Sequence, residues 1–151
     1  MLSVIIPTHN SERELQVLLP VLVPAAVDGL VRQVIAADAG STDASEMICE
    51  DAGALWVQGD LMAAAARARG DILLVLPVDL RLRRGWDDSV REHLEARAGT
   101  ALLSEGPLGV LERLSGPKAA GVLIKAEAFR GLKVGDLASL RRKLGRAKVL
   151  S

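Results

Sequence analysis

The sequence predicts a single α/β domain in which helices cover both faces of a mostly parallel sheet, giving a three-layer α/β/α sandwich. Two observations carry this prediction. Four short apolar runs alternate with helical segments over the first 77 residues, and such alternation forms parallel strands joined by right-handed crossovers. The length of 151 residues, half of them apolar, suits one domain with its own hydrophobic core. We therefore treat 1–151 as one unit.

The elements of the first half are bounded by prolines, glycines and capping residues. The run Leu2–Ile6 is rich in β-branched residues and meets Pro7, which predicts a buried strand ending there. A helix with an acidic first turn is expected over 12–19, because Pro20 and Pro24 bend or end it. The next expected elements are a strand over 31–37, a helix over 44–52, a strand over 54–57, a helix over 61–69 and a strand over 71–76.

The second half is less regular. Apolar residues at helical spacing predict a helix over 86–97, and a short strand is expected over 100–103. The segment 105–118 holds three glycines and two prolines, which indicates a loop with one helical turn. The last expected elements are a strand over 121–124 and a closing helix over 136–144.

Charge divides the chain although the formal net charge is zero. Residues 1–80 carry four basic and eleven acidic side chains, whereas residues 81–151 carry fifteen and eight. Two functional surfaces, or unevenly solvated faces of one domain, both fit this division. The balanced net charge and only three aromatic residues argue against nucleic acid as a partner. The single cysteine, Cys49, excludes a disulfide framework and predicts a packed thiol.

No targeting or membrane-spanning segment is expected. The apolar start is too short for a signal peptide. The longest apolar run, 17–27, is broken by prolines and is far below the roughly 20 residues that span a bilayer. A cytoplasmic protein is the expectation. The basic second half leaves contact with a membrane surface open, and the sequence also leaves a homo-oligomer open.

Polar residues follow three of the predicted strands, at 7–10, 38–43 and 77–79. Because ligands of an open parallel sheet bind beyond the carboxyl ends of its strands, we expect these segments to converge on one edge. Their hydroxyl, amide and carboxylate groups suit a nucleotide and a divalent cation. A nucleotide site is therefore predicted at this edge.

Three blocks in these segments resemble the family 2 glycosyltransferases of GT-A fold. The opening Val-Ile-Ile-Pro-Thr-His-Asn-Ser-Glu over 4–12 is similar to that family's strand and Pro-Thr-Tyr-Asn-Glu. The text Asp-Ala-Gly-Ser-Thr-Asp over 38–43 is similar to Asp-Asp-Gly-Ser-Thr-Asp. The text Gly-Asp at 70–71, a strand and Pro-Val-Asp over 77–79 is similar to the block that ends in Asp-x-Asp. Their order and spacing agree over 1–86.

The resemblance implies a nucleotide-binding half over 1–80 and a reduced acceptor half over 81–151. It implies an inverting, metal-assisted transfer of a sugar from a nucleoside diphosphate sugar to a hydroxyl acceptor. It implies that Asp79 binds Mn²⁺ or Mg²⁺, although Pro77 replaces the first acid of Asp-x-Asp, and that Asp136 acts as general base. The substrate-binding residues that it implies are Pro7, Thr8, His9, Glu12, Asp38 and Gly40.

The acceptor half departs furthest from the family pattern. Gly135 stands where the first of two acids is usual, and Asp136 by itself also fits a simple helix N-cap. A GT-A-like domain that binds a nucleotide or serves as a scaffold without catalysis is therefore the alternative. A nucleotidyltransferase is disfavoured because no glycine-rich phosphate loop follows the first strand.

Overall fold

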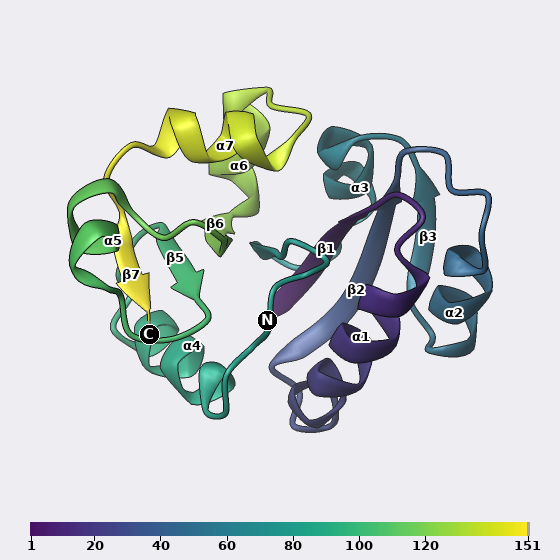
Figure 1. The fold of residues 1–151 in the computed structure, drawn as a ribbon, viewed down its shortest axis with the longest axis horizontal. Coiled ribbons are helices and arrows are strands. Elements are labelled where there is room, and N and C mark those ends of the chain that lie inside the picture. The colour runs from purple at the N-terminus through teal and green to yellow at the C-terminus, as the bar shows by residue number, and fades with distance from the viewer. Residues whose placement is uncertain (151) are drawn as a thin grey trace.

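The structure, a computed structural model, describes residues 1–150 and contains one seven-stranded sheet of order β3-β2-β1-β4-β6-β5-β7 (Figure 1). Strands β1 to β4 are parallel, β6 is antiparallel to both of its neighbours, and β7 is parallel to β5. The strands are β1 Leu2–Thr8, β2 Val31–Asp38, β3 Leu55–Gln58, β4 Ile72–Val75, β5 Ala101–Ser104, β6 Ala120–Lys125 and β7 Lys148–Leu150. The predicted fold class is confirmed.

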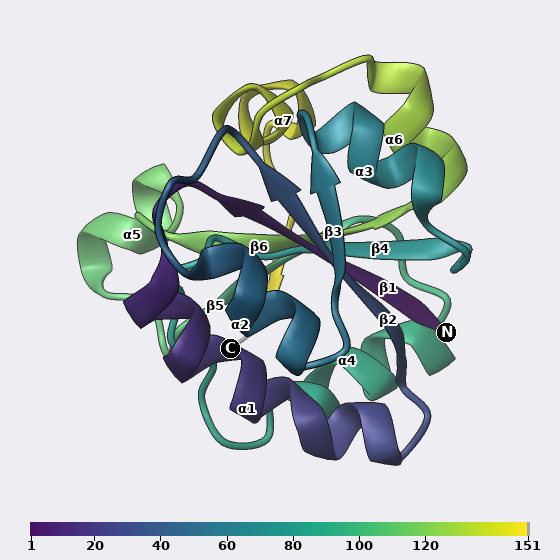
Figure 2. The same ribbon diagram turned by 90° about the vertical axis from the view of Figure 1, so that its right-hand side faces the viewer.

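Helices cover both faces of this sheet (Figure 2). One face carries α1 Glu12–Val27, α2 Ser45–Asp51 and α4 Trp86–Glu95, whose buried side chains share one hydrophobic cluster. The other face carries α3 Leu61–Arg67, α6 Ala126–Leu132 and α7 Leu137–Leu144, whose buried side chains share a second cluster. The short helix α5, Val110–Ser115, buries none of its residues. The chain is therefore a three-layer α/β/α sandwich.

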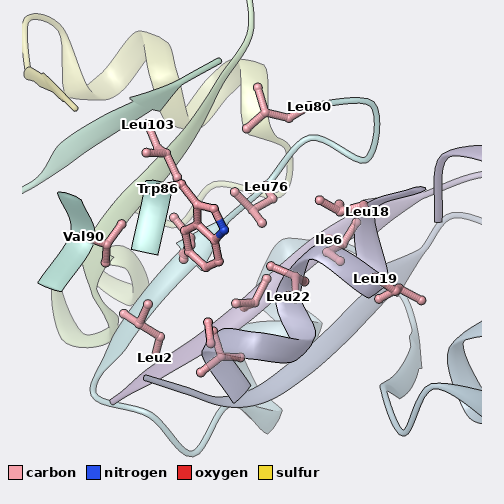
Figure 3. Close-up of a cluster of buried hydrophobic side chains, with 14 of the residues drawn as sticks. Leu2, Ile6, Leu18, Leu19, Leu22, Leu76, Leu80, Trp86, Val90 and Leu103 are labelled. Atoms are coloured by element: carbon pink, nitrogen blue, oxygen red, sulfur yellow. The ribbon is translucent and has the colours of Figure 1, made fainter. Parts of the chain in front are cut away.

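The first cluster joins the two halves of the chain (Figure 3). The indole of Trp86, at the start of α4, lies among side chains of the sheet and of α1, and is 4% exposed. Its neighbours in the cluster include Leu76 after β4 and Leu22 of α1. Because these side chains come from before and after residue 80, the charge division does not mark a boundary between separate cores.

Helix α1 corrects the prediction that Pro20 and Pro24 end the first helix, because it runs through both to Val27. Both prolines are exposed, so the carbonyls that lose an amide partner face solvent, which lowers the cost of proline in a helix. Leucines on the opposite side of α1 are buried and hold the helix on the sheet. None of the helices described in residues 1–150 has the length and hydropathy that a membrane-spanning segment requires.

Three further boundaries differ from the predictions. Strand β1 continues through Pro7 to Thr8. Proline has no amide to donate to a neighbouring strand, but β4 pairs with β1 only as far as Ile5. No hydrogen bond between β1 and β4 is therefore lost at Pro7. Helix α6 was not predicted, and its Phe129 is fully buried. Strand 121–124 is not the last one, since β7 follows α7. A strand of three residues leaves too short an apolar pattern to detect from the sequence.

Candidate functional site

The strand order creates a switch point beside β1. From β1 the chain continues outward through β2 and β3, and then returns to place β4 on the other side of β1. All four strands are parallel, so the segments after β1, β2 and β4 leave the sheet at the same edge. The structure thus brings together the three polar segments that the sequence singled out, at the position where open α/β sheets bind ligands.

Asp38, at the end of β2, organises the loop that follows it. Its Oδ2 accepts hydrogen bonds from the backbone amides of Gly40 at 2.9 Å and Ser41 at 2.8 Å. Its Oδ1 accepts hydrogen bonds from the hydroxyls of Thr8 at 2.9 Å and Ser41 at 2.5 Å. The carboxylate is 3% exposed, and these four donors match the four lone pairs of its two oxygens. Thr8 and Asp38 therefore fix the loops after β1 and β2 relative to each other.

The environment of Asp38 favours its ionised form. Burial by itself raises the pKa of a carboxyl group, but the hydrogen bonds from Ser41, Gly40 and Thr8 outweigh it and hold the pKa of Asp38 below its ordinary value. Four donors around a carboxylate also leave no free lone pair. A nucleoside can therefore bind Asp38 only by displacing one of these hydroxyls.

The loop after β1 interlocks with the same segment. Asn10 adopts a left-handed conformation with φ 47°. Its backbone amide donates to Ser41 Oγ at 2.8 Å, and its side-chain Oδ1 accepts from the backbone amide of Thr42 at 2.8 Å. Glu12 Oε2 accepts from the amide of Ala44 at 3.0 Å, just ahead of α2. In this structure Glu12 thus holds the end of the loop that leads from β2 into α2. Sequence reasoning missed Asn10 and Ser41 in this role, although short polar side chains that bond to nearby backbone were the available signal.

The side chains of His9 and Asp79 are exposed at this edge. Among residues 1–150, neither makes a side-chain hydrogen bond or an ion pair. Asp79 lines a shallow pocket of about 310 Å³ together with Arg13 and Val17 of α1. No group of three or more His, Cys, Asp or Glu side chains in the described part of the chain is placed to hold a metal ion. Asp79 is therefore a free carboxylate at the rim, and a second exposed acid, Glu14, lines the same pocket.

Gly135 and Asp136 form a tight junction between α7 and α3. The carbonyl of Gly135 accepts a hydrogen bond from the amide of Leu61 at 3.0 Å, at the start of α3. A Cβ atom at position 135 would lie 2.7 Å from Oδ2 of Asp60, the N-cap of α3. An acid at position 135 would therefore meet both a steric contact and a like charge.

Asp136 is the N-cap of α7. Its Oδ1 accepts from the amide of Ser139 at 2.7 Å and its Oδ2 from the hydroxyl of Ser139 at 2.9 Å. The bond from the Ser139 amide and that from its hydroxyl lower the pKa of Asp136. The capping role that the sequence offered for Asp136 is confirmed, while its role as general base stays a prediction.

Replacing Asp136 separates these two roles. Asp136→Ala removes the cap, so the free energy of unfolding should fall by about 1 kcal/mol. Asp136→Ser keeps an N-cap oxygen but no carboxylate, so its stability should stay close to that of the parent chain. Urea unfolding followed by circular dichroism measures both. Equal loss of stability in the two variants would contradict the cap.

A larger hollow lies at the opposite edge of the sheet and is a different feature. It has a volume of about 1330 Å³ and is lined by the starts of β2 and β3 and by faces of α1 and α2. Small side chains such as Ala26, Ala52 and Ala54 leave this space open. None of the residues in the three sequence blocks lines it, so it is not the candidate nucleotide site.

The chain is similar in structure to glucosyl-3-phosphoglycerate synthase from Mycobacterium tuberculosis. The match to its complex with Mn²⁺, UDP and glucosyl-3-phosphoglycerate has a TM-score of 0.66 at 22% identity, and covers 84% of this chain and 57% of the enzyme. The complex with Mn²⁺, UDP-glucose and phosphoglyceric acid gives a TM-score of 0.66 at 22% identity with the same coverage. The complex with Mn²⁺, UDP-glucose and glycerol 3-phosphate gives a TM-score of 0.65 at 23% identity, again with the same coverage of both chains.

These matches establish a GT-A-like fold for the chain. The chain spans somewhat more than half the length of these glycosyltransferase structures. No protein-family model and no curated protein matches the sequence.

Proposed function

We propose that the chain binds a nucleoside diphosphate sugar at the carboxyl edge of its sheet and transfers the sugar to a hydroxyl acceptor with inversion, as a family 2 glycosyltransferase does. The observation that carries this proposal is the placement of the loops after β1, β2 and β4 around the switch point beside β1. The solved structures of similar fold include complexes with UDP and UDP-glucose, which supports a nucleotide sugar as the ligand.

The predicted site residues divide into two groups by exposure. His9 and Asp79 are exposed and free at the rim, so we assign His9 direct contact with the donor and Asp79 contact with the metal ion that accompanies the donor. Thr8, Asp38 and Glu12 hold the loops in place through hydrogen bonds within the chain. A loop fixed in this way presents its backbone to the ligand at little further cost in conformational entropy. Pro7 and Gly40 would shape the wall of the pocket.

A divalent cation fits this site only when it binds together with the donor, whose phosphates supply further ligands. The chain offers the carboxylate of Asp79 and no cluster of three or more candidate ligand side chains within residues 1–150. One protein carboxylate together with substrate phosphates and water is an ordinary way to hold Mg²⁺ or Mn²⁺. Asp79 would hold the ion, and the ion would neutralise the charge that grows on the leaving diphosphate.

The acceptor side of the proposal depends on Asp136. An exposed carboxylate with a lowered pKa is ionised at neutral pH, and can accept a proton, but only weakly as a base. Gly135 supplies no second acid. For this reason the alternative is a domain that binds the nucleotide without transfer, and Asp136→Ser distinguishes the two: it keeps a helix cap but would abolish transfer.

Titration calorimetry with UDP-glucose and with a guanosine diphosphate sugar, each with and without Mn²⁺, tests the donor site. We expect Mn²⁺ to strengthen binding, and Asp79→Ala to weaken the Mn²⁺-dependent binding by about tenfold or more, because one charged ligand of the ion is lost. The same variant should leave metal-free binding nearly unchanged.

Asp51→Ala is the matched control, since Asp51 is an exposed acid at the end of α2, on the opposite edge of the sheet. It should bind as the parent chain does. A donor affinity that changes neither with Mn²⁺ nor with Asp79→Ala would overturn the metal-assisted mechanism. Nucleotide binding without sugar transfer or donor hydrolysis would favour the alternative.

A further inference from the structure

Helix α1 is apolar on two sides, and the fold buries only one of them. Its leucines face the sheet, and Leu18, Leu19 and Leu22 lie in the buried cluster of Figure 3. Between residues 17 and 27 the helix contains no polar residue, so its solvent side is apolar as well. The exposed valines and prolines of this side, which we call the α1 face, are Val17, Pro20, Val21, Val23, Pro24 and Val27.

Such a face is unusual for a helix at the surface. A surface helix ordinarily presents polar residues opposite its buried stripe, and a helix that is apolar all round is ordinarily covered. Here Val17, Val23 and Val27 are 56%, 55% and 79% exposed, and helices α2 and α4 lie to either side of α1 (Figure 1). A single exposed valine needs no explanation, but a contiguous set along one helix indicates a contact site.

The charged side chains of this helix stand at the two ends of the α1 face. Arg13 is at its start, next to Glu14, and Asp28 at its end pairs with Arg91 of α4 at 3.8 Å. Arg13 and Asp28 each lie four residues from a member of the α1 face, so helical periodicity places both on the same side as that face. Each end therefore offers both a base and an acid, and the centre is uncharged.

We propose that the α1 face binds the α1 face of a second copy of the chain, with the two helices antiparallel about a two-fold axis. A two-fold contact must be self-complementary, and an antiparallel pair centred between Pro20 and Val21 meets this condition. In this register valines lie opposite prolines along the centre. Arg13 lies opposite the partner's Asp28, so that one pair of opposite charges closes each end of the apolar contact.

The acids around the α1 face decide against an anionic partner. Helix α1 carries two acids and one base, α2 three acids, and α4 four acids and one base. A carboxylate that accepts from an amide, as Glu12 does, keeps its charge and is included here. This surplus of negative charge would repel a bilayer of anionic lipids or a nucleic acid.

The same acids also repel between two copies, but over a longer distance. Packed helices are about 8–10 Å apart, so the acids of α2 and α4 lie about one Debye length to the side of the contact in physiological salt. We therefore expect association to become stronger as salt rises, because salt screens this repulsion. A contact held mainly by opposite charges would show the reverse dependence.

The contact is small, and we expect a weak dimer. A standard interface buries about 800 Å² on each partner, and one helix face of six side chains offers less. The prolines also leave the carbonyls of Gln16 and Pro20 without an amide partner, and these oxygens need water within the contact. A dissociation constant on the order of micromolar is therefore expected.

Sedimentation velocity over a concentration series tests this association. The mean mass of the parent chain should rise towards that of a dimer at about tens of micromolar. Val21→Asp places like charges beside the two-fold axis, and should weaken association by about tenfold or more. The matched control is Leu114→Asp, since Leu114 is 77% exposed on α5; it should associate as the parent chain does. Circular dichroism of each variant checks that the fold is kept.

The charged ends test the register. Arg13→Asp should weaken association by about threefold to tenfold, because both ends lose an opposite charge and gain a like one. Adding Asp28→Arg reverses both ends and should restore part of the affinity. The two positions lie about 22 Å apart along one helix, so they can compensate each other only across two copies. Asp51→Arg is the matched control, because it returns the same net charge from the exposed end of α2 and should restore nothing.

Oxidative cross-linking gives an independent readout of the same register. Val21→Cys lies beside the proposed axis, so oxidation should join two copies through a disulfide. Val27→Cys should not be joined, because the two thiols would be about 20 Å apart. The native Cys49 is buried and burial raises the pKa of its thiol to about 11, so it should not react.

Four results would overturn the proposal, and none of them depends on nucleotide binding. The parent chain could sediment as a monomer at every concentration and salt. Leu114→Asp could weaken association as much as Val21→Asp, which would place the contact on α5. Asp28→Arg could fail to restore the affinity lost in Arg13→Asp, or Val27→Cys could cross-link as readily as Val21→Cys; either result would contradict the antiparallel pairing.

Discussion

Asp38→Ala should lower the free energy of unfolding by about 2–4 kcal/mol, one of the two largest effects that we expect for a single substitution in this chain. The change removes the acceptor for the hydroxyl of Thr8 and for the amides of Gly40 and Ser41. A buried donor left without a partner costs about 1–3 kcal/mol, and solvent can reach only some of these. Urea unfolding at neutral pH measures the difference.

The same carboxylate makes stability depend on pH. The pKa of Asp38 is lowered in the folded chain, so the stability that it contributes is present above its ordinary value of 3.8 and is lost as pH falls through the lower folded pKa. The parent chain should therefore lose stability below about pH 4. The curve of Asp38→Ala should be shallower there, although Asp43 and Asp136, whose pKa values are also lowered, preserve part of the slope.

Asp51→Ala is the control for both measurements, because Asp51 is exposed and its side chain makes no hydrogen bond or ion pair among residues 1–150. It should change the free energy of unfolding by less than about 0.5 kcal/mol. If Asp38→Ala were as mild as this control, the hydrogen-bond network around Asp38 would not hold the two loops together.

Gly70→Ala should destabilise the chain by about 2–3 kcal/mol, through close packing and not through charge. A Cβ atom at position 70 would lie 2.8 Å from the backbone nitrogen of Ser3 and 3.0 Å from the carbonyl oxygen of Met1. The amide of Gly70 also donates to Ser3 Oγ at 2.8 Å. Since backbone atoms of β1 cannot move without disturbing the centre of the sheet, the start of β4 must shift instead.

Gly99→Ala provides the comparison, because a Cβ atom there meets nothing within 4 Å. Thermal and urea unfolding of the two variants should differ by about 2 kcal/mol or more. Equal stability of Gly70→Ala and Gly99→Ala would mean that the segment before β4 can move away from β1 without loss of stability.

How far the sequence predicted the candidate site depends on the kind of residue. The three polar segments after β1, β2 and β4 followed from the ends of apolar runs, and the parallel sheet confirmed that they share an edge. The sequence did not predict that Asp38 is enclosed by four donors or that Glu12 bonds to the amide of Ala44. Those contacts depend on which loops lie side by side. The hydrophobic periodicity of the sequence does not show which loops are neighbours.

Helix α1 and the C-terminal elements show the same limit. Proline is unfavourable in an isolated helix, yet α1 continues through Pro20 and Pro24 because burial of its leucine face outweighs the local preference. Strand β7 exists because β5 offers an edge on which residues 148–150 pair. Neither result follows from the local sequence.

The sequence by itself determined the class of the fold, the packed state of Cys49, and the strand ends at which polar groups gather, because these follow from local hydrophobic pattern and residue chemistry. The tertiary structure decided that Asp38 is buried while His9 and Asp79 are free, that Gly135 packs against Asp60, and that helix α5 buries none of its residues. Exposure and hydrogen-bond partners are set by contacts between segments far apart in sequence, and only the assembled sheet brings those segments together.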